Sequence, residues 1–154
     1  MMRYDKPAEK EFEERTIQVN RISKKTKGGN RIRFATLVAV GDRKGRVGIG
    51  LAKAADVASA LKKANKYATE HMITVPMRGT TIPHEMRLKW GAAKILIKPA
   101  PEGSGVIAGG AIRAIMEVAG VRDVVAKILG TANKATNVYA TFAALKMLRT
   151  YETK

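Results

Sequence analysis

The chain has 154 residues, a formal net charge of +16 and 45% hydrophobic residues, so it is too apolar for a disordered basic tail. Its length suffices for one ordinary core or two small ones. The absence of Cys excludes a disulfide framework, a thiolate zinc site and a cysteine nucleophile. No stretch reads as a membrane span or a secretory signal, so we expect a soluble, cytoplasmic protein.

Residues 1–14 mix three basic with five acidic side chains and follow no hydrophobic period, so we expect a mobile acidic arm. The charge then reverses, because the segment from Arg15 to Gly41 holds seven basic residues and no acidic one. A single-sign segment of this kind attracts polyanions. Nucleic acid is favoured over a membrane surface, since no amphipathic terminal helix carries aromatic anchors.

Alternating apolar positions predict three antiparallel strands, over residues 16–23, 31–40 and 46–52. A Lys- and Gly-rich hairpin tip separates the first two strands, and the turn GDRKG separates the second from the third. In the third strand Gly48 and Gly50 leave one face bare, so we expect another backbone to approach that face closely.

Asp56 is expected to cap a helix that ends near Met72, so residues 15–75 form a β-β-β-α domain. Residues 76–154 are expected to form a second domain of order β-β-α-β-α, and the fold class is α+β. The elements of the second domain are two strands joined near Gly91, a helix over 106–119, a strand over 121–129, and a last helix that Thr131 or Asn133 caps and that ends near Arg149.

The residues do not supply a catalytic set, so we expect no enzyme activity, no cofactor and no metal. His71 and His84 are the only histidines, and without Cys they do not make a metal site. Ser104 lies in G-S-G and not in the nucleophile-elbow pattern. The acidic residues form no pair at a spacing useful for acid–base catalysis.

A Gly-rich segment fits the dinucleotide-binding pattern G-x-G-x-x-A at Gly103, Gly105 and Ala108, and Asp123 follows twenty residues after the first glycine. The context argues against a nucleotide site, because two prolines precede the loop and Asp123 begins the next strand. Two interpretations stay open. Free amides before the helix bind a phosphate of RNA, or the glycines allow close packing against a neighbour.

The hairpin tip is the strongest candidate for RNA binding. Lys24, Lys25 and Lys27 lie beside two glycines, and a slender cationic tip of this kind enters a groove and neutralises phosphates. We expect Gly28 to adopt a positive φ in the turn. Phe34 is the single aromatic neighbour and is expected to face the core, so shape and backbone contacts should dominate over base stacking.

Two long segments resemble the family of small-subunit ribosomal protein five of bacterial type: NRISKKTKGGNRIRFATLVAVGDRKGRVGIGLAKAADVASALKKA and IKPAPEGSGVIAGGAIRAIMEVAGVRDVVAKILG. The resemblance covers residues 12–148. It implies a first domain similar to a double-stranded-RNA-binding domain and a second α+β domain with a left-handed β-α-β crossover. General topology rules alone favour a right-handed crossover.

The resemblance also implies a function, that of a structural constituent of the small ribosomal subunit that supports its assembly. Members bind ribosomal RNA near the decoding region, lie on the messenger entry side and contact the fourth and eighth small-subunit proteins. In the family, changes in the hairpin confer spectinomycin resistance, and changes at the contact with the fourth protein alter translational accuracy. We expect no membrane partner and no small-molecule substrate.

The match assigns Gly103, Gly105 and Arg113 to the interface with the fourth protein. Because a cation is disfavoured near a helix N-terminus, Arg113 is also expected to need an external acidic partner. Asn30 stands where the family usually has Arg, which removes one expected phosphate contact. The RNA-binding candidates combine matched hairpin positions with the neighbouring cations: Arg15, Arg21, Ser23, Lys24, Lys25, Lys27, Gly28, Gly29, Asn30, Arg31 and Arg33.

Two other classes of protein stay open on the residues alone. An enzyme would use the Gly-rich loop to hold a nucleotide, and a free-standing regulator would use the first domain to bind double-stranded RNA. The second domain favours the ribosomal role, because a regulator does not need a packed, Gly-rich surface for protein contacts.

Overall fold

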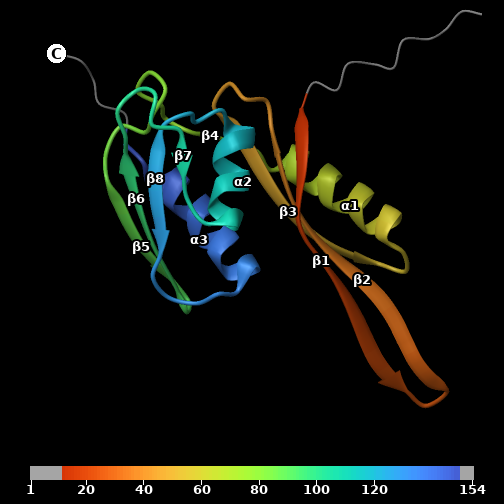
Figure 1. Ribbon diagram of the computed structural model, residues 1–154. Helices are drawn as coiled ribbons and strands as arrows, with labels where there is room; N and C mark the ends of the chain where they lie inside the picture. The colour runs from red at the N-terminus through yellow and green to blue at the C-terminus, as the bar shows by residue number, and fades with distance from the viewer. Residues whose placement is uncertain (1–11, 150–154) are drawn as a thin grey trace, which may run out of the picture.

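The computed structural model describes residues 12–149, which fold into two α+β units joined along one broad contact (Figure 1). The predicted α+β class is confirmed, with a β-rich first unit and a β/α second unit. In chain order the elements are β1 (Glu13–Thr26), β2 (Gly29–Gly41), β3 (Arg46–Ala54), α1 (Val57–Glu70), β4 (Ile73–Thr74), β5 (Met86–Trp90), β6 (Ala93–Pro99), β7 (Val106–Ile107), α2 (Gly110–Ala119), β8 (Val124–Ile128) and α3 (Lys134–Met147).

The first sheet has the order β1-β2-β3-β4, and its neighbouring strands run antiparallel. α1 covers one face of it, and the predicted cap is confirmed because the Asp56 carboxylate accepts the Ser59 amide at 2.6 Å. The prediction that the arm extends to residue 14 is wrong. Glu13 and Glu14 lie in β1, where pairing with β2 satisfies their backbone and Glu13 binds Arg43. Residues 1–11 of that arm lie outside the described residues.

The expected close approach to the third strand is confirmed at the contact between β3 and α1. A Cβ added to Gly48 would collide with the carbonyl oxygen of Ala68, and one added to Gly50 would collide with that of Ala64. Both alanines are fully buried. The helix therefore rests directly on the strand backbone, and only small residues on both sides permit this spacing.

The second sheet has the order β5-β6-β8-β7, in which β7 and β8 run parallel and the other neighbours antiparallel. α2 connects the parallel pair, which gives the implied β-α-β unit, and the hand of its crossover stays a prediction. The prediction that the helix starts at residue 106 is wrong. Val106 and Ile107 form β7, because an extended pair gains backbone hydrogen bonds at the edge of β8, and α2 begins at Gly110.

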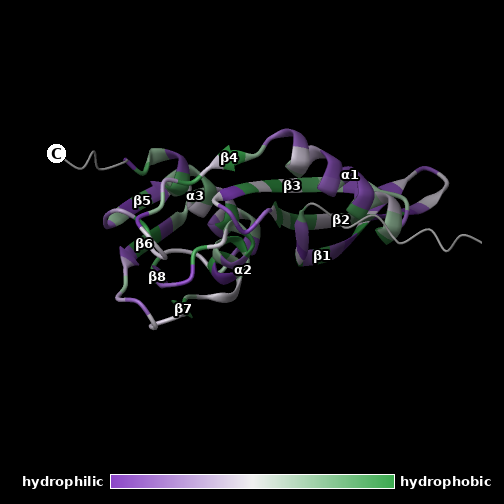
Figure 2. Cartoon of the chain, turned by 90° about the horizontal axis from the view of Figure 1, so that it is seen from above, coloured by the Kyte–Doolittle hydropathy of each residue, from purple (hydrophilic) through white to green (hydrophobic). Residues whose placement is uncertain are grey.

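The two units share one hydrophobic core, because the first sheet is buried on both faces. α1 packs on the face that holds Val38 and Val40, whereas the face of Leu37 and Ala39 belongs to the core of the second unit. Figure 2 shows the hydrophobic colour along β2 and β3, between α1 and α2. The shared cluster also includes Val47, Ile49, Ile95, Ile97, Ile112, Ile115, Met116 and Leu145.

A backbone contact joins the units where the β2–β3 turn meets the end of α2. The amide of Arg43 donates to the carbonyl of Val118 at 3.0 Å, and the amide of Gly45 donates to that of Ala119 at 2.8 Å. The last carbonyls of a helix lack partners within the helix, so this turn satisfies two of them. We call this contact the turn–helix junction. A Cβ on Gly41 or on Gly120 would collide with backbone atoms across it.

Substitution of Gly41 by Ala should destabilise the protein by about 1–3 kcal/mol, because the new methyl group collides with the Val118 carbonyl and pushes the units apart. The measurement is the urea midpoint of unfolding. Gly28→Ala is the matched control, since a Cβ at Gly28 meets nothing within 4 Å and its φ is not left-handed. Equal midpoints for the two variants would contradict the role of this junction.

Candidate nucleic-acid interface

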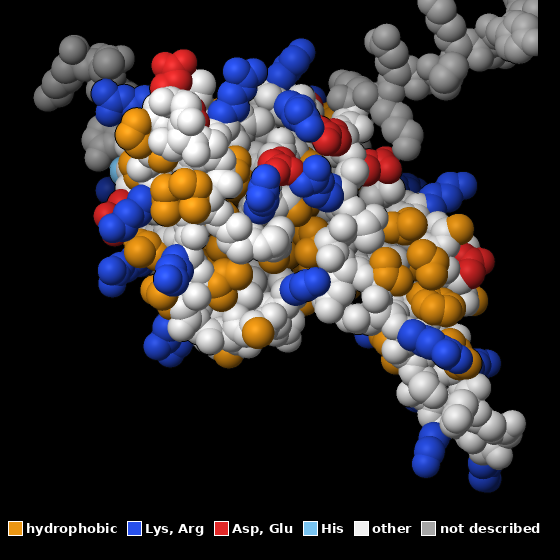
Figure 3. Space-filling view, viewed as in Figure 1, with side chains coloured by type: hydrophobic (Ala, Val, Ile, Leu, Met, Phe, Trp, Pro, Cys, Tyr) orange, Lys and Arg blue, Asp and Glu red, His pale blue; other side chains and the backbone are white. Residues whose placement is uncertain are grey.

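The β1–β2 hairpin projects from the body of the protein as a two-stranded ribbon (Figure 1). The pairing of β2 with β3 begins at Phe34, opposite Ala54, so the residues of β2 before Phe34 pair only with β1 and the ribbon there has no third strand. We call residues 21–33 the basic hairpin. Its candidate side chains are exposed, and on the face shown in Figure 3 its cations stand without an acidic neighbour.

The strand register distributes the cations over both faces of the basic hairpin. Lys24 lies directly opposite Arg31, and Arg33 follows Arg31 on the same face. Arg21 and Lys25 point to the other face, because side chains alternate along a strand. The basic hairpin is therefore cationic all round, as the acid-free sequence segment predicts.

Like charges that face each other across two strands destabilise the pair. Within residues 12–149, the structure gives no ion pair between Lys24, Arg31 or Arg33 and a carboxylate. The repulsion between these side chains is therefore not relieved inside the protein. A polyanion lying along the ribbon would relieve it and would gain the release of its own counterions.

The tip is a two-residue turn of Lys27 and Gly28, and the Thr26 hydroxyl donates to the Gly29 carbonyl at 2.6 Å. The prediction that Gly28 adopts a positive φ is wrong. Gly29 holds that conformation, with φ +128°, because the chain reverses its direction as it enters β2. The tip therefore requires glycine at position 29 for its backbone, whereas position 28 is open on all sides.

Ser23 and Asn30 also lie exposed on the basic hairpin, but the structure does not bring Arg15 to it. Arg15 lies at the base of β1 and forms an ion pair with Glu117 of α2. Glu117 also accepts the Nε of Arg113 at 2.9 Å, one helical turn away. The expectation that Arg113 needs an external acidic partner is therefore wrong, because the same helix supplies one.

The Gly-rich loop before α2 is held by one buried carboxylate. Asp123 Oδ1 accepts the amides of Gly103 at 3.1 Å and Gly105 at 3.0 Å, and Oδ2 accepts the Thr80 hydroxyl at 2.5 Å. These two amides are thus not free to bind a phosphate, which excludes that interpretation for them. The hydrogen bonds from Thr80 and Gly105 lower the pKa of Asp123 from its ordinary value.

The protein has a second cationic surface, which was not predicted from the sequence. On the second sheet, the face opposite α2 and α3 carries alternating exposed cations from three neighbouring strands. The available signal was the alternation of Lys and Arg with apolar residues in RLKW and KILIKP, which predicts one polar face. These cations are Arg87, Lys89, Lys94, Lys98 and Lys127.

Within residues 12–149, no three His, Cys, Asp or Glu side chains come together in an arrangement that could hold a metal ion. None of the helices in this range is long and apolar enough to cross a membrane. The histidines make contacts within the protein: His71 stacks on Tyr67, and the Nε2 of His84 accepts the Arg149 amide at 2.9 Å.

Fold and site together define a basic, two-domain α+β protein with a projecting cationic hairpin. Models of protein families match this chain twice, as "Ribosomal protein S5, N-terminal domain" over residues 12–76 and as "Ribosomal protein S5, C-terminal domain" over residues 88–154. The chain belongs to the ribosomal protein S5 family. It is accordingly a structural, non-enzymatic component of the small ribosomal subunit in the cytoplasm, where it binds ribosomal RNA and ribosomal proteins.

Replacement of Asp123 by Asn should make the stability of the protein less dependent on acidic pH. The folded-state pKa of Asp123 lies below the ordinary value of 3.8, so its contribution is present above that value and is lost as the pH falls through the folded-state pKa. Urea midpoints of unfolding are measured from pH 6 to pH 3. The difference in midpoint between wild type and variant should become smaller toward low pH.

Glu102→Gln is the control for this series, because it neutralises an exposed carboxylate in the same loop. Its midpoints should follow those of the wild type at each pH. A difference in urea midpoint between wild type and Asp123→Asn that stays constant at every pH would show that the carboxylate does not stabilise the protein through its charge.

Proposed function

We propose that the basic hairpin is the element that docks this protein on ribosomal RNA near the decoding region. The observation that carries the proposal is the ribbon of Lys24, Arg31, Arg33, Arg21 and Lys25, which extends beyond the folded body with its cations on both faces. A ribbon of two strands is narrow enough to lie between RNA elements and to contact phosphates on either side. Its contacts are electrostatic and read the backbone more than the sequence.

The tip supports this role, because Gly28 and Gly29 leave the turn backbone uncovered beside Lys27. Nothing lies within 4 Å of a Cβ placed at Gly28 or Gly29, so RNA can approach the turn backbone closely. The resemblance implies that changes in this hairpin confer spectinomycin resistance, and the matched positions are Arg21, Ser23, Lys24, Lys27, Gly28 and Gly29. Asn30 stands where the family usually has Arg, so the ribbon carries one cation fewer there, and Arg31 beside it retains the charge of the strand.

A second part of the proposal concerns the Gly-rich loop, which we assign to the contact with the fourth small-subunit protein. Gly103 and Gly105 have φ of +90° and +75°, and a Cβ on either meets nothing within 4 Å. The buried Asp123 fixes their backbone, so the loop presents a fixed backbone without a side chain at these two positions. Contacts with the eighth protein and a place on the messenger entry side follow from the resemblance in the same way.

Replacement of Lys24 by Ala should lower the affinity for a small-subunit ribosomal RNA fragment and reduce the dependence of log K on log salt by about one unit. The stability of the protein should not fall, because the substitution removes the repulsion with Arg31. Filter binding at several salt concentrations, beside a thermal melt, measures both effects.

The control for this experiment is Lys44→Ala, an exposed lysine in the turn at the opposite end of β2. It should leave the salt dependence unchanged. Equal slopes of log K against log salt for wild type and Lys24→Ala would mean that the basic hairpin is solvated in the complex. This result would refute its docking role.

Replacement of Gly105 by Arg should raise the misreading of messenger RNA in assembled ribosomes, because a long side chain on the exposed loop separates it from the fourth protein. The measurement is a reporter of stop-codon readthrough in cells that carry the variant gene. Since φ +75° disfavours a side chain, the melting temperature of the free protein is measured as well. Normal readthrough in subunits that contain the variant would contradict this assignment of the loop.

A further inference from the structure

The aromatic side chains of this protein gather in one open cleft between the two units. Residues 12–149 contain six aromatic residues, of which four line the cleft: Tyr67, Trp90, Tyr139 and Phe142. The buried hydrophobic core of the described residues contains no aromatic side chain. The aromatic rings of the cleft thus lie at the edge of the core, where Tyr139 and Phe142 pack against it and Tyr67 and Trp90 are exposed to solvent.

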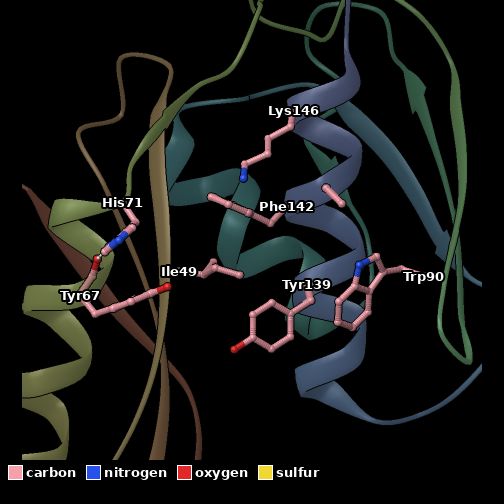
Figure 4. Close-up of a pocket in the computed structure, with 8 residues that line it drawn as sticks. Ile49, Tyr67, His71, Trp90, Tyr139, Phe142 and Lys146 are labelled. Carbon is pink, nitrogen blue, oxygen red and sulfur yellow. Dashed lines mark hydrogen bonds between the residues drawn. The ribbon is translucent and has the colours of Figure 1, made fainter.

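The cleft has two aromatic walls that come from different units (Figure 4). On the α1 side, the rings of Tyr67 and His71 stack with their centroids 4.1 Å apart. On the other side, Trp90 from β5 stacks on Tyr139 from α3 at 5.4 Å between centroids. Ile49 of β3 lies between the two walls, and the enclosed volume is about 310 Å³.

The charge of the cleft is complementary to an anionic ligand. No carboxylate is among the described residues that line it, and Lys146 reaches over the ring of Phe142 with its Nζ 4.9 Å from the ring centroid. Burial raises the pKa of the Tyr139 hydroxyl, which keeps that wall uncharged. The exposed fractions of Tyr67 and Trp90 are 52% and 45%, so their faces are accessible to a ligand.

From these observations we infer that the cleft binds one unpaired nucleobase of RNA. The base stacks on the aromatic walls, and Lys146 lies near the phosphate of the same nucleotide. The volume is at the lower end of the range for ligand pockets, which suits one flat ring system rather than a folded peptide segment. The inference rests on the proposed function, since it adds a preference for an unpaired nucleotide to the RNA binding of the basic hairpin.

Trp90 is the only Trp of the chain, so its fluorescence reports directly on the cleft. The full-length protein is titrated with an RNA duplex and with the same duplex carrying one bulged adenosine. The bulged RNA should quench Trp90 and should bind about ten-fold tighter than the duplex. Tyr139→Leu should remove most of this ten-fold preference and leave the affinity for the plain duplex unchanged.

The matched control is Phe12→Leu, which replaces an aromatic residue outside the cleft and should keep both the quenching and the preference. A thermal melt verifies that each variant is folded, and Lys146→Ala provides a second test with a surface substitution that should also reduce the preference.

The two proposals fail in different ways. Lys24→Ala should weaken the binding of both RNAs alike and keep their ratio, because the basic hairpin does not read the bulge. If the wild type binds the two RNAs equally and Trp90 is not quenched, the proposal that the cleft binds a nucleobase is refuted, and the proposal that the basic hairpin docks on RNA is unaffected. Quenching by a neighbouring ribosomal protein, with no quenching by the bulged RNA, would equally overturn the inference and assign the cleft to a protein side chain.

Discussion

The arrangement of this molecule depends on the backbone hydrogen bonds between the β2–β3 turn and the end of α2. The amides of Arg43 and Gly45 reach the carbonyls of Val118 and Ala119 only because no side chain stands at Gly41 or Gly120. Helix-end carbonyls buried without partners would be costly, so the turn and the helix each satisfy the other. The opposite end of β2 forms the basic hairpin. One strand therefore connects the turn–helix junction to the tip of the basic hairpin and fixes the direction of the tip relative to the second unit.

Beside this junction, a shared hydrophobic core joins the two units. β2 is buried on both faces over much of its length, and its sequence FATLVAV is accordingly apolar except for the buried Thr36. One face belongs to α1 and the other to α2 and α3, so separation of the units would expose Leu37 and Ala39 to water. The aromatic cleft depends on this shared core as well. Tyr67 and Tyr139 come from different units, so the spacing of their walls follows from the way the two units pack on each other.

Local sequence patterns predict much of this structure, because they reflect interactions between residues that lie close together in the chain. Alternation gives the three long strands, Asp56 gives the start of α1, and the bare face of Gly48 and Gly50 predicts the close helix. The acid-free segment predicts the cations of the basic hairpin, but only the strand register shows that Lys24 faces Arg31. Contacts between distant residues leave no such pattern. Examples are Arg15 with Glu117, Asp123 with the Gly-rich loop, and the cleft itself, whose four aromatic residues come from three separate segments.

Acidic and basic side chains pair with each other near the turn–helix junction, whereas the basic hairpin carries cations alone. This difference links the fold of the molecule to its function. Near the turn–helix junction, Glu13 binds Arg43, Asp42 binds Arg46, and Glu117 binds both Arg15 and Arg113. Hydrogen bonding by Arg43 lowers the pKa of Glu13, as the contacts of Asp123 lower its own, so these carboxylates stay ionised at neutral pH. The acidic side chains thus neutralise the cations that hold the units together. The cations of the basic hairpin receive no such partner within residues 12–149, so their charge stays available to a polyanion.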